Sequence, residues 1–180
     1  MDIRVVTQQD IPAILAIYSH YVRETATTFE YEIPTLSEFS KRVHEITARY
    51  PYIVACEQDR VVGYAYASTY KARAAYDWSA EVSVYLAPEA IGKKIGRALY
   101  EELEHALRTQ QVHQVLACIT SANCSSISFH EKMGYHVVGQ FQQVGYKFDQ
   151  WWDITWMQKQ LLTSERPADF CPFGSGGESK

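Results

Sequence analysis

The chain has 180 residues, 47% of them hydrophobic, which is enough for one domain with a substantial core. Its formal net charge of −4 argues against a general nucleic-acid binder, and no apolar run has the length of a membrane-spanning helix. The N-terminus shows no signal-peptide pattern, so we expect a soluble protein of the cytoplasm.

In chain order, the hydrophobic periodicity predicts β-α-α-β-β-β-α-β-α-β-β. These elements fill residues 1–162 as a single domain without repeats or an internal linker, and residues 163–180 form a tail that is predicted to be flexible, with little to pack against. The expected elements are a strand at 3–6, helices at 9–24 and 35–48, strands at 52–57, 61–69 and 80–86, a helix at 95–107, a strand at 114–120, a short helix ending near 132, and strands at 135–143 and 151–160.

Local signals support several of these boundaries. The first two helices each follow a threonine with an acidic residue three positions later, the pattern of a capping box. Gly63 inside a strand indicates a bulge or a close backbone approach. Cys56 and Cys118 lie in apolar strand-like runs, and since no cysteine or histidine shows the spacing of metal ligands, we predict buried free thiols and no metal. The capping pairs are Thr7 with Asp10 and Thr35 with Glu38.

Two glycines and three cations gather where the helix at 95–107 begins. Unpaired N–H groups and the helix macrodipole already make this end positive, so the cations are misplaced for stability. A bound phosphate or pyrophosphate would explain them, because glycines let backbone N–H groups approach an anion closely. The alternative is a glycine-rich turn with solvated lysines. The stretch comprises Gly92, Lys93, Lys94, Ile95, Gly96 and Arg97.

The stretch also resembles the acyl-CoA loop of the GNAT acetyltransferases, Gln/Arg-x-x-Gly-x-Gly/Ala between a strand and a helix. Gly96 fits the final glycine of this motif, whereas Ile91 and Lys94 replace its first and fourth residues. Asn123 and the later FHEKMGY, residues 129–135, are similar to a second GNAT motif at the expected spacing. The order of the elements is also that of a GNAT fold, an α+β (mixed α/β) architecture with a mixed central β-sheet flanked by helices.

Further stretches resemble the phosphinothricin and methionine sulfoximine N-acetyltransferase (Bar/Pat-like) branch of this family. They are YKARAAYDWSAE at 70–81, the VYL strand, and QVGYKFDQWWD at 143–153, together with His130, which replaces the tyrosine of the wider family. The resemblance implies transfer of acetyl from acetyl-CoA to the α-amino group of a small amino acid analogue, and it implies a homodimer. It also implies acyl-CoA contacts from Val84, Tyr85, Leu86 and Asn123.

The reaction needs a proton acceptor, because an ammonium has no lone pair to attack a thioester. We predict Glu81 for this role, since it begins the central strand in apolar surroundings and the resemblance places the base there; the alternative is an ordinary salt-bridged carboxylate. His130 is the second catalytic candidate, as an acid, an auxiliary base or part of the pocket, or else as a packed residue. The loop before Glu81 supplies the predicted substrate contacts, Lys71, Arg73, Tyr76 and Trp78, unless it is merely a solvated basic loop.

Two other functions remain open from the sequence. The chain could acetylate another amine, such as a protein N-terminus or a polyamine, although an anionic amino acid suits the cations Lys71 and Arg73 better. It could also be an acyl-CoA-binding regulator without catalysis, which the presence of Glu81 and His130 disfavours.

Overall fold

The computed structural model describes residues 1–174, and residues 175–180 of the predicted tail lie outside the described part. Within that part, the main helices are α1 (Ile11–Glu24), α2 (Leu36–Thr47), α3 (Ile95–Thr109) and α4 (Cys124–Lys132). The strands are β1 (Asp2–Val5), β2 (Tyr52–Glu57), β3 (Arg60–Thr69), β4 (Ser79–Leu86), β5 (Gln114–Thr120), β6 (His136–Lys147) and β7 (Gln150–Gln160). The predicted order of helices and strands is confirmed.

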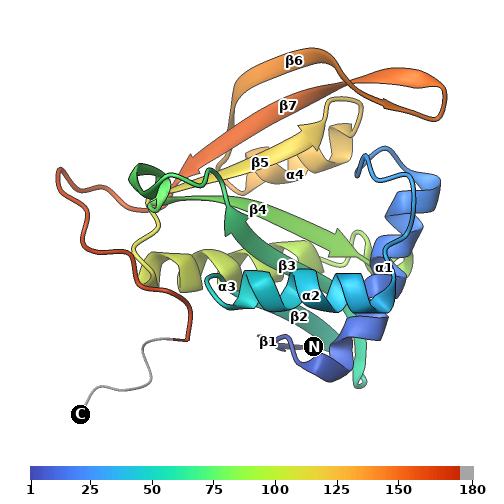
Figure 1. The fold of residues 1–180 in the computed structure, drawn as a ribbon, viewed down its shortest axis with the longest axis horizontal. Helices are drawn as coiled ribbons and strands as arrows, with labels where there is room; N and C mark the ends of the chain where they lie inside the picture. Colours follow the sequence, from blue (N-terminus) through green and yellow to red (C-terminus); the bar gives the residue numbers. More distant parts are fainter. Residues whose placement is uncertain (175–180) are drawn as a thin grey trace.

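The strands form one seven-stranded sheet with the order β1-β2-β3-β4-β5-β7-β6 (Figure 1). The central pair, β4 and β5, is parallel and is joined through α3, while the other neighbouring pairs are antiparallel. The predicted mixed sheet flanked by helices is therefore confirmed.

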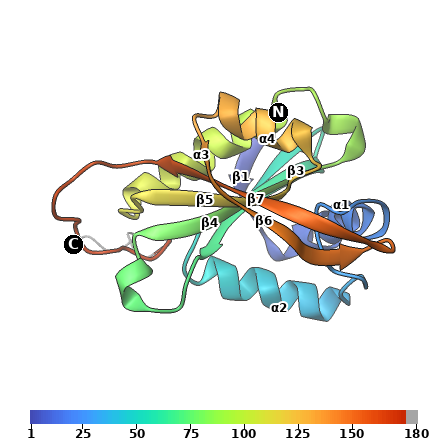
Figure 2. The ribbon, with the colours of Figure 1, turned by 90° about the horizontal axis from the view of Figure 1, so that it is seen from above.

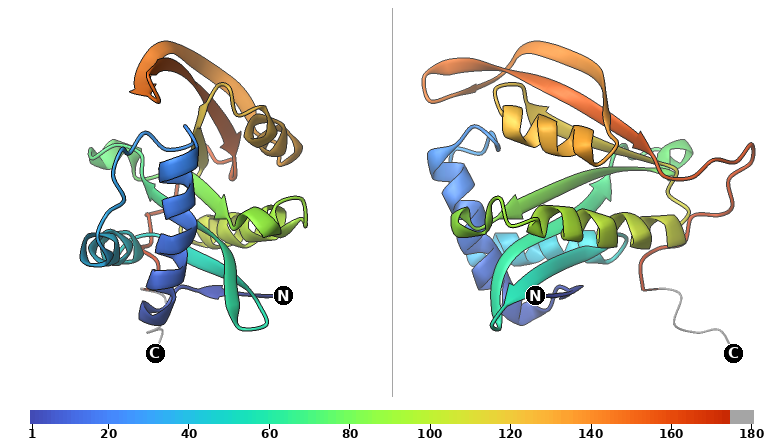
Figure 3. Two further views of the ribbon diagram at one scale, coloured as in Figure 1. Left: turned by 90° about the vertical axis from the view of Figure 1, so that its right-hand side faces the viewer. Right: turned by 180° about the vertical axis from the view of Figure 1, so that it is seen from behind.

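Helices cover both faces of the sheet. Figure 2 shows α1 and α2 on one side and α3 and α4 on the other, and Figure 3 shows the same layers from the side and from behind. The apolar residues of α3 fall at helical spacing, so one stripe of this helix is buried against the sheet. Its fully buried members are Ile95, Leu99, Tyr100, Leu103 and Leu107.

The two strands at the centre of the sheet separate along their length. Their ladder holds only three pairs, from Ser79 opposite Gln114 to Glu81 opposite Leu116. Beyond them β4 stays paired with β3, and β5 stays paired with β7, so a gap opens between the two halves of the sheet. Figure 1 shows this divergence between β4 and β5.

Both capping boxes form as predicted, with one local difference. Thr35 and Glu38 exchange hydrogen bonds at the start of α2. The Asp10 carboxylate accepts from the backbone N–H of Thr7, but the first turn is a 3-10 turn, Gln8–Asp10, and α1 begins at Ile11. Asp10 also receives two hydrogen bonds from Arg4, of 2.7 and 2.8 Å, which tie this turn to β1.

Gly63 takes both predicted roles. A bulge shifts the register of β2 against β3 beside it, so that Ala55 pairs with Gly63 and Cys56 with Val61. A Cβ at Gly63 would lie 2.5 Å from Cδ2 of Leu86, which is closer than two carbon atoms can approach.

Three sequence-based expectations differ from the structure. β6 runs to Lys147 instead of residue 143, because its turn into β7 consists of Phe148 and Asp149, both with positive φ. Cys56 is buried as expected, but Cys118 is exposed. On the face that carries Cys118, α1 packs mainly on β3 and β4, and α2 packs on β2 and β3.

The third difference concerns the tail, for which the sequence predicts little packing. Residues 168–173 instead contact the domain: Cys171 N–H donates to the Gln110 carbonyl, and Phe173 N–H donates to the Arg49 carbonyl. Phe170 packs against the hydrophobic core, a contact that the sequence pattern does not indicate, while the flexibility of the tail stays a prediction. The apolar residues of the tail pack on a surface formed by distant parts of the chain.

Candidate active site

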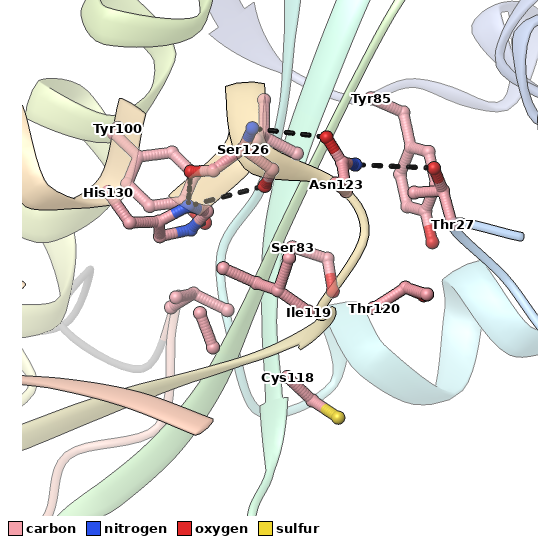
Figure 4. A pocket seen from close by; sticks show the side chains of 13 residues that line it. Thr27, Ser83, Tyr85, Tyr100, Cys118, Ile119, Thr120, Asn123, Ser126 and His130 are labelled. Atoms are coloured by element: carbon pink, nitrogen blue, oxygen red, sulfur yellow. Dashed lines mark hydrogen bonds between the residues drawn. The ribbon is translucent and has the colours of Figure 1, made fainter. Parts of the chain in front are cut away.

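A pocket occupies the gap between β4 and β5 and is lined from both faces of the sheet (Figure 4). Ser83, Tyr85 and Cys118 line it on the side of α1, while Tyr100 and His130 line it on the side of α3 and α4. The pocket therefore connects the two faces through the sheet.

Backbone groups of β4 point into this gap. The N–H of Ala87 donates to the Val62 carbonyl of β3, and N–H directions alternate along a strand, so the N–H of Val84 points toward β5. The backbone groups of Leu86 on this edge of β4 already have a hydrogen-bond partner. The Tyr21 hydroxyl donates to the Leu86 carbonyl at 2.7 Å and accepts from the Leu86 N–H at 3.3 Å. Of the three residues of β4 predicted to contact acyl-CoA, Val84 thus offers a backbone donor toward the gap, and Tyr85 lines the pocket.

Glu81 is the last residue of β4 that pairs with β5, so it lies where the gap begins. Its side chain is half-buried, and burial raises the pKa of the carboxyl above 4.5 while the positive charge of Lys71 opposes the shift. Within residues 1–174 its carboxylate forms no salt bridge and accepts no hydrogen bond. The ion pair considered as an alternative for Glu81 is therefore absent from this described part of the chain.

Cys118 lies near this carboxylate. It follows Leu116 by two residues on β5, and Leu116 pairs with Glu81, so the two side chains share a face of the sheet. Although the residue is exposed overall, partial desolvation of its thiol at the pocket and the negative charge of Glu81 raise the pKa of Cys118 to about 11. Its thiol is thus protonated at neutral pH and is a weak nucleophile.

His130 lies on the opposite face and is held by both of its ring nitrogens. Nδ1 is 2.8 Å from the Ser126 carbonyl, and Nε2 is 2.9 Å from the Tyr100 hydroxyl (Figure 4). A carbonyl can only accept, so Nδ1 carries the proton and Nε2 accepts from Tyr100. Burial lowers the pKa of His130, which is consistent with a neutral ring.

Asn123 lines the pocket, but its side chain caps α4. Its Oδ1 accepts from Ser126 N–H at 3.1 Å and from the Ser125 hydroxyl at 2.9 Å, as an N-cap residue does. Its Nδ2 donates to the Thr27 hydroxyl at 3.4 Å, which links α4 to the loop after α1 (Figure 4). The predicted contact of Asn123 with the CoA arm stays a prediction.

The loop of predicted substrate contacts leads from β3 to β4. Lys71, Arg73 and Tyr76 are exposed, and the effect of Lys71 on the Glu81 pKa indicates that this loop lies close to the carboxylate. Trp78 is half-buried, and its indole N–H donates to the Ala168 carbonyl of the C-terminal segment at 2.7 Å. The structure therefore gives Trp78 a partner in the tail.

The predicted anion loop forms the start of α3. Gly92 and Lys94 have φ values of 81° and 65°, and Lys93 and Lys94 are exposed. Arg97 instead pairs with Glu101 one turn further on, at 2.8 Å. A Cβ at Gly96 would lie 3.5 Å from Cδ1 of Leu86, so this first turn packs beside the end of β4.

Sequence reasoning missed Tyr21, Tyr100 and Cys118 as residues of the site. Both tyrosines occur at helical spacing among apolar residues, so they resemble core positions, and no local pattern gives the partners of their hydroxyls. The alternation of β5 gives the side of Cys118 but not the opening beside it. No group of metal-ligating side chains occurs among residues 1–174, and none of the helices there has the length and hydropathy to cross a membrane.

Comparison with known proteins agrees with this geometry. Residues 3–156 match the family model described as an acetyltransferase (GNAT) domain. The chain is 38% identical to a phosphinothricin N-acetyltransferase of Alcaligenes faecalis, over 88% of this chain and 82% of the relative. It is 35% identical to an L-methionine sulfoximine/L-methionine sulfone acetyltransferase of Salmonella typhimurium, over 95% of this chain and all of the relative.

Among solved structures, a phosphinothricin acetyltransferase of Sinorhizobium meliloti in complex with AcCoA has a TM-score of 0.90 and 35% identity, covering 97% of this chain and 96% of the other. A family match over most of the chain, together with relatives above 30% identity, establishes the family. The chain belongs to the GNAT acetyltransferases.

Proposed function

We propose that this protein transfers the acetyl group of acetyl-CoA to the α-amino group of a small anionic amino acid analogue such as phosphinothricin or methionine sulfoximine. The names of its relatives support this substrate class. The observation that carries the proposal is the position of Glu81, a half-buried carboxylate without an ion-pair partner among residues 1–174, which lies where β4 and β5 separate, beside a cationic loop.

The residues around the gap fit acetyl-CoA. The N–H of Val84 points into the gap, where it can donate to the pantetheine arm or to the thioester carbonyl. The first turn of α3 offers backbone N–H groups next to Lys93 and Lys94, which suits a pyrophosphate. Acetyl-CoA supplies the acetyl group in an activated thioester.

Glu81 accepts a proton from the substrate ammonium, which frees the nitrogen lone pair for attack. A carboxyl with a raised pKa holds this proton better than an exposed one, so desolvation of Glu81 favours the transfer. His130 is less suited to this step, because its Nε2 lone pair already accepts a hydrogen bond from Tyr100. We assign His130 to the wall of the pocket, where it orients the Tyr100 hydroxyl.

Lys71 and Arg73 hold the acidic group of the substrate. A guanidinium matches a carboxylate or a phosphinate with two hydrogen bonds, and both side chains are exposed on a loop near Glu81. An amino acid bound through its acidic end would place its ammonium toward the carboxylate. A polyamine bound at this loop would instead be repelled by the positive charges of Lys71 and Arg73.

The protein is also proposed to form a homodimer through the β6–β7 hairpin. This hairpin projects from the domain in Figure 1 and exposes several large apolar side chains, a pattern typical of interaction surfaces. They include Val138, Phe141, Val144, Tyr146 and Trp151. Light scattering after gel filtration should give twice the mass of the chain, and Phe141→Asp should shift the protein toward a monomer.

The substrate assignment is tested by release of free CoA from acetyl-CoA. Phosphinothricin, methionine sulfoximine, ordinary amino acids, a peptide and polyamines are compared with the wild type, Glu81→Gln and, as a control, Glu102→Gln on the exposed face of α3. Removal of a general base should lower turnover of the two analogues by about 10²- to 10⁴-fold. Turnover of polyamines or peptides alone would overturn the substrate class, and binding of acetyl-CoA without any turnover would favour a regulator.

A further inference from the structure

The C-terminal strap, defined as residues 164–174, lies beyond the region that matches the family model, residues 3–156. It is fixed to the domain at two places. The N–H of Cys171 donates to the Gln110 carbonyl at 3.1 Å, and the Gln110 amide returns a bond to the Cys171 carbonyl at 2.9 Å. The N–H of Phe173 donates to the Arg49 carbonyl at 3.0 Å.

The strap also contacts the end of the substrate loop, residues 70–78. The Ala168 carbonyl accepts from the Trp78 indole at 2.7 Å. The Arg49 guanidinium lies 4.4 Å from the centre of the Phe170 ring and donates to the Asp77 carboxylate at 2.8 Å. Two consecutive loop residues are thus held by the strap, one directly and one through Arg49.

Apart from the strap, the Trp78 carbonyl accepts from the N–H groups of His113 and Gln114 at 2.8 and 3.0 Å, and the Tyr70 and Tyr76 rings pack edge-on within the loop, with centroids 5.8 Å apart. Residues 71–76 are all exposed, and the short turn Ala74–Tyr76 bonds within the loop. At the other end the Tyr70 ring packs edge-on against Trp156 of β7, with centroids 5.9 Å apart. The path of Lys71 and Arg73 is therefore determined by Tyr70 on one side and by Asp77 and Trp78 on the other.

We propose that the C-terminal strap is a positioning element that holds the substrate loop and thereby sets the affinity for the acidic end of the amine substrate. The inference rests on the proposed function, since that function gives Lys71 and Arg73 their ligand. Acetyl-CoA is predicted to contact the gap between β4 and β5 and the start of α3, whereas the strap contacts described above are made to Arg49, Trp78 and Gln110.

The main experiment compares a chain ending at Thr163 with a matched control ending at Gly174, which keeps every contact described above. Loss of the strap should raise KM for phosphinothricin or methionine sulfoximine by about fivefold or more, the lower end of ordinary coupling between sites. KM for acetyl-CoA should stay within about twofold of the wild type, because uncoupled sites are additive. An equal rise in both KM values, or no change in either, would overturn the proposal.

A point variant guards against general damage from truncation. Phe170→Ala removes the ring beside Arg49 and should reproduce the selective rise in KM, while Phe170→Tyr keeps the ring and should restore the wild-type value. A wild-type KM in Phe170→Ala would show that the ring does not transmit the effect, which contradicts the route through Arg49 and Asp77.

A readout without substrate separates this inference from the proposed function. Trypsin cleaves after Lys71 and Arg73, and mass spectrometry can follow these two sites among the others. The strap-free chain should be cut at these two sites faster than the Gly174 control. The two chains are compared at the same interval below their own melting temperatures, so that a difference in global stability does not contribute. Unchanged cleavage would overturn the proposal, whereas faster cleavage in a protein that acetylates no amino acid would refute the proposed function alone.

Discussion

The Tyr100 hydroxyl and Nε2 of His130 lie 2.9 Å apart, and this contact assigns the protonation state of the ring. Because Nδ1–H donates to the Ser126 carbonyl, Nε2 of the neutral ring has only its lone pair to offer, and Tyr100 donates to it. Burial raises the pKa of Tyr100 and lowers that of His130, so both groups stay neutral. The pocket wall facing α4 is therefore uncharged.

We predict that His130 has a pKa below 6.5 and that its neutral ring is the Nδ1–H tautomer. ¹⁵N NMR of the ring should show this tautomer and a titration midpoint below that of a free histidine. Tyr100→Phe removes the donor to Nε2 and should raise the midpoint. Tyr135→Phe is the matched control, because its ring packs 5.1 Å from the imidazole while its hydroxyl donates to Glu104. A midpoint above 6.5 in the wild type would contradict this assignment.

The lowered pKa of His130 also predicts how acid affects stability. The unfolded chain takes up a proton near pH 6.5, and the folded state resists it, so the unfolded state binds more protons as the pH falls. The free energy of unfolding should therefore decrease below pH 6.5, and this part of the decrease should be absent in a stably folded His130→Gln variant. Urea unfolding of the wild type and of the variant at several pH values measures the two free energies.

Glu81 should determine the acid limb of the pH–rate profile. Its carboxyl must be ionised to accept a proton, and its pKa is raised above 4.5, so kcat/KM should fall as the pH drops through a midpoint above that value. Lys71 opposes this shift, so Lys71→Met should move the midpoint to higher pH. A midpoint at or below 4.5 would contradict the desolvated base.

The sequence predicted well what depends on local pattern. Thr35 and Glu38 identify the start of α2 because both hydrogen bonds of a capping box lie within four residues. The alternation around Glu81 likewise identified β4. The partners of His130 and Trp78 lie 30 and 90 residues away, so no periodicity reports them.

The opening of the sheet also escapes local reasoning. It depends on where β4 ceases to pair with β5, which is a property of two strands separated by α3. The gap and the lining by Tyr100 therefore required the structure. The resemblance to a family predicted a cofactor in this gap. It did not indicate which backbone groups already have a hydrogen-bond partner, such as those of Leu86 with Tyr21.

The contact of Arg4 with Asp10 should contribute strongly to stability. The guanidinium lowers the pKa of the buried Asp10 carboxyl from 3.8 to about 2. Such a shift corresponds to about 2 kcal/mol of the free energy of unfolding, fully present above pH 4 and lost as the pH falls toward 2. Asp10→Asn should lose this amount at pH 7, and Glu45→Gln, in an exposed pair with Lys41, should lose almost none. Equal losses would contradict the prediction.

Lys147 should hold the loop after α1. Its buried ammonium donates to the carbonyls of Val22, Thr25 and Thr28, each at 2.8 Å. Lys147→Met leaves these carbonyls without their donor and should cost about 2–4 kcal/mol of stability. Hydrogen exchange should rise in residues 25–28, while Lys132→Met, on an exposed site of α4, should change neither. Unaltered exchange in this loop would show that other contacts suffice.

The backbone of Lys94 has a conformation that disfavours a side chain. Its φ of 65° is left-handed, a conformation that glycine adopts without strain. Lys94→Gly should therefore raise the free energy of unfolding by about 0.5–1 kcal/mol, although one cation is lost from the proposed pyrophosphate site. Lys93 lacks a positive φ, so Lys93→Gly should destabilise the protein.

If the glycine at 94 also lets the backbone approach the cofactor, acetyl-CoA should bind Lys94→Gly more tightly than Lys93→Gly. Weaker binding by Lys94→Gly would mean that the charge at position 94 matters more than the close approach.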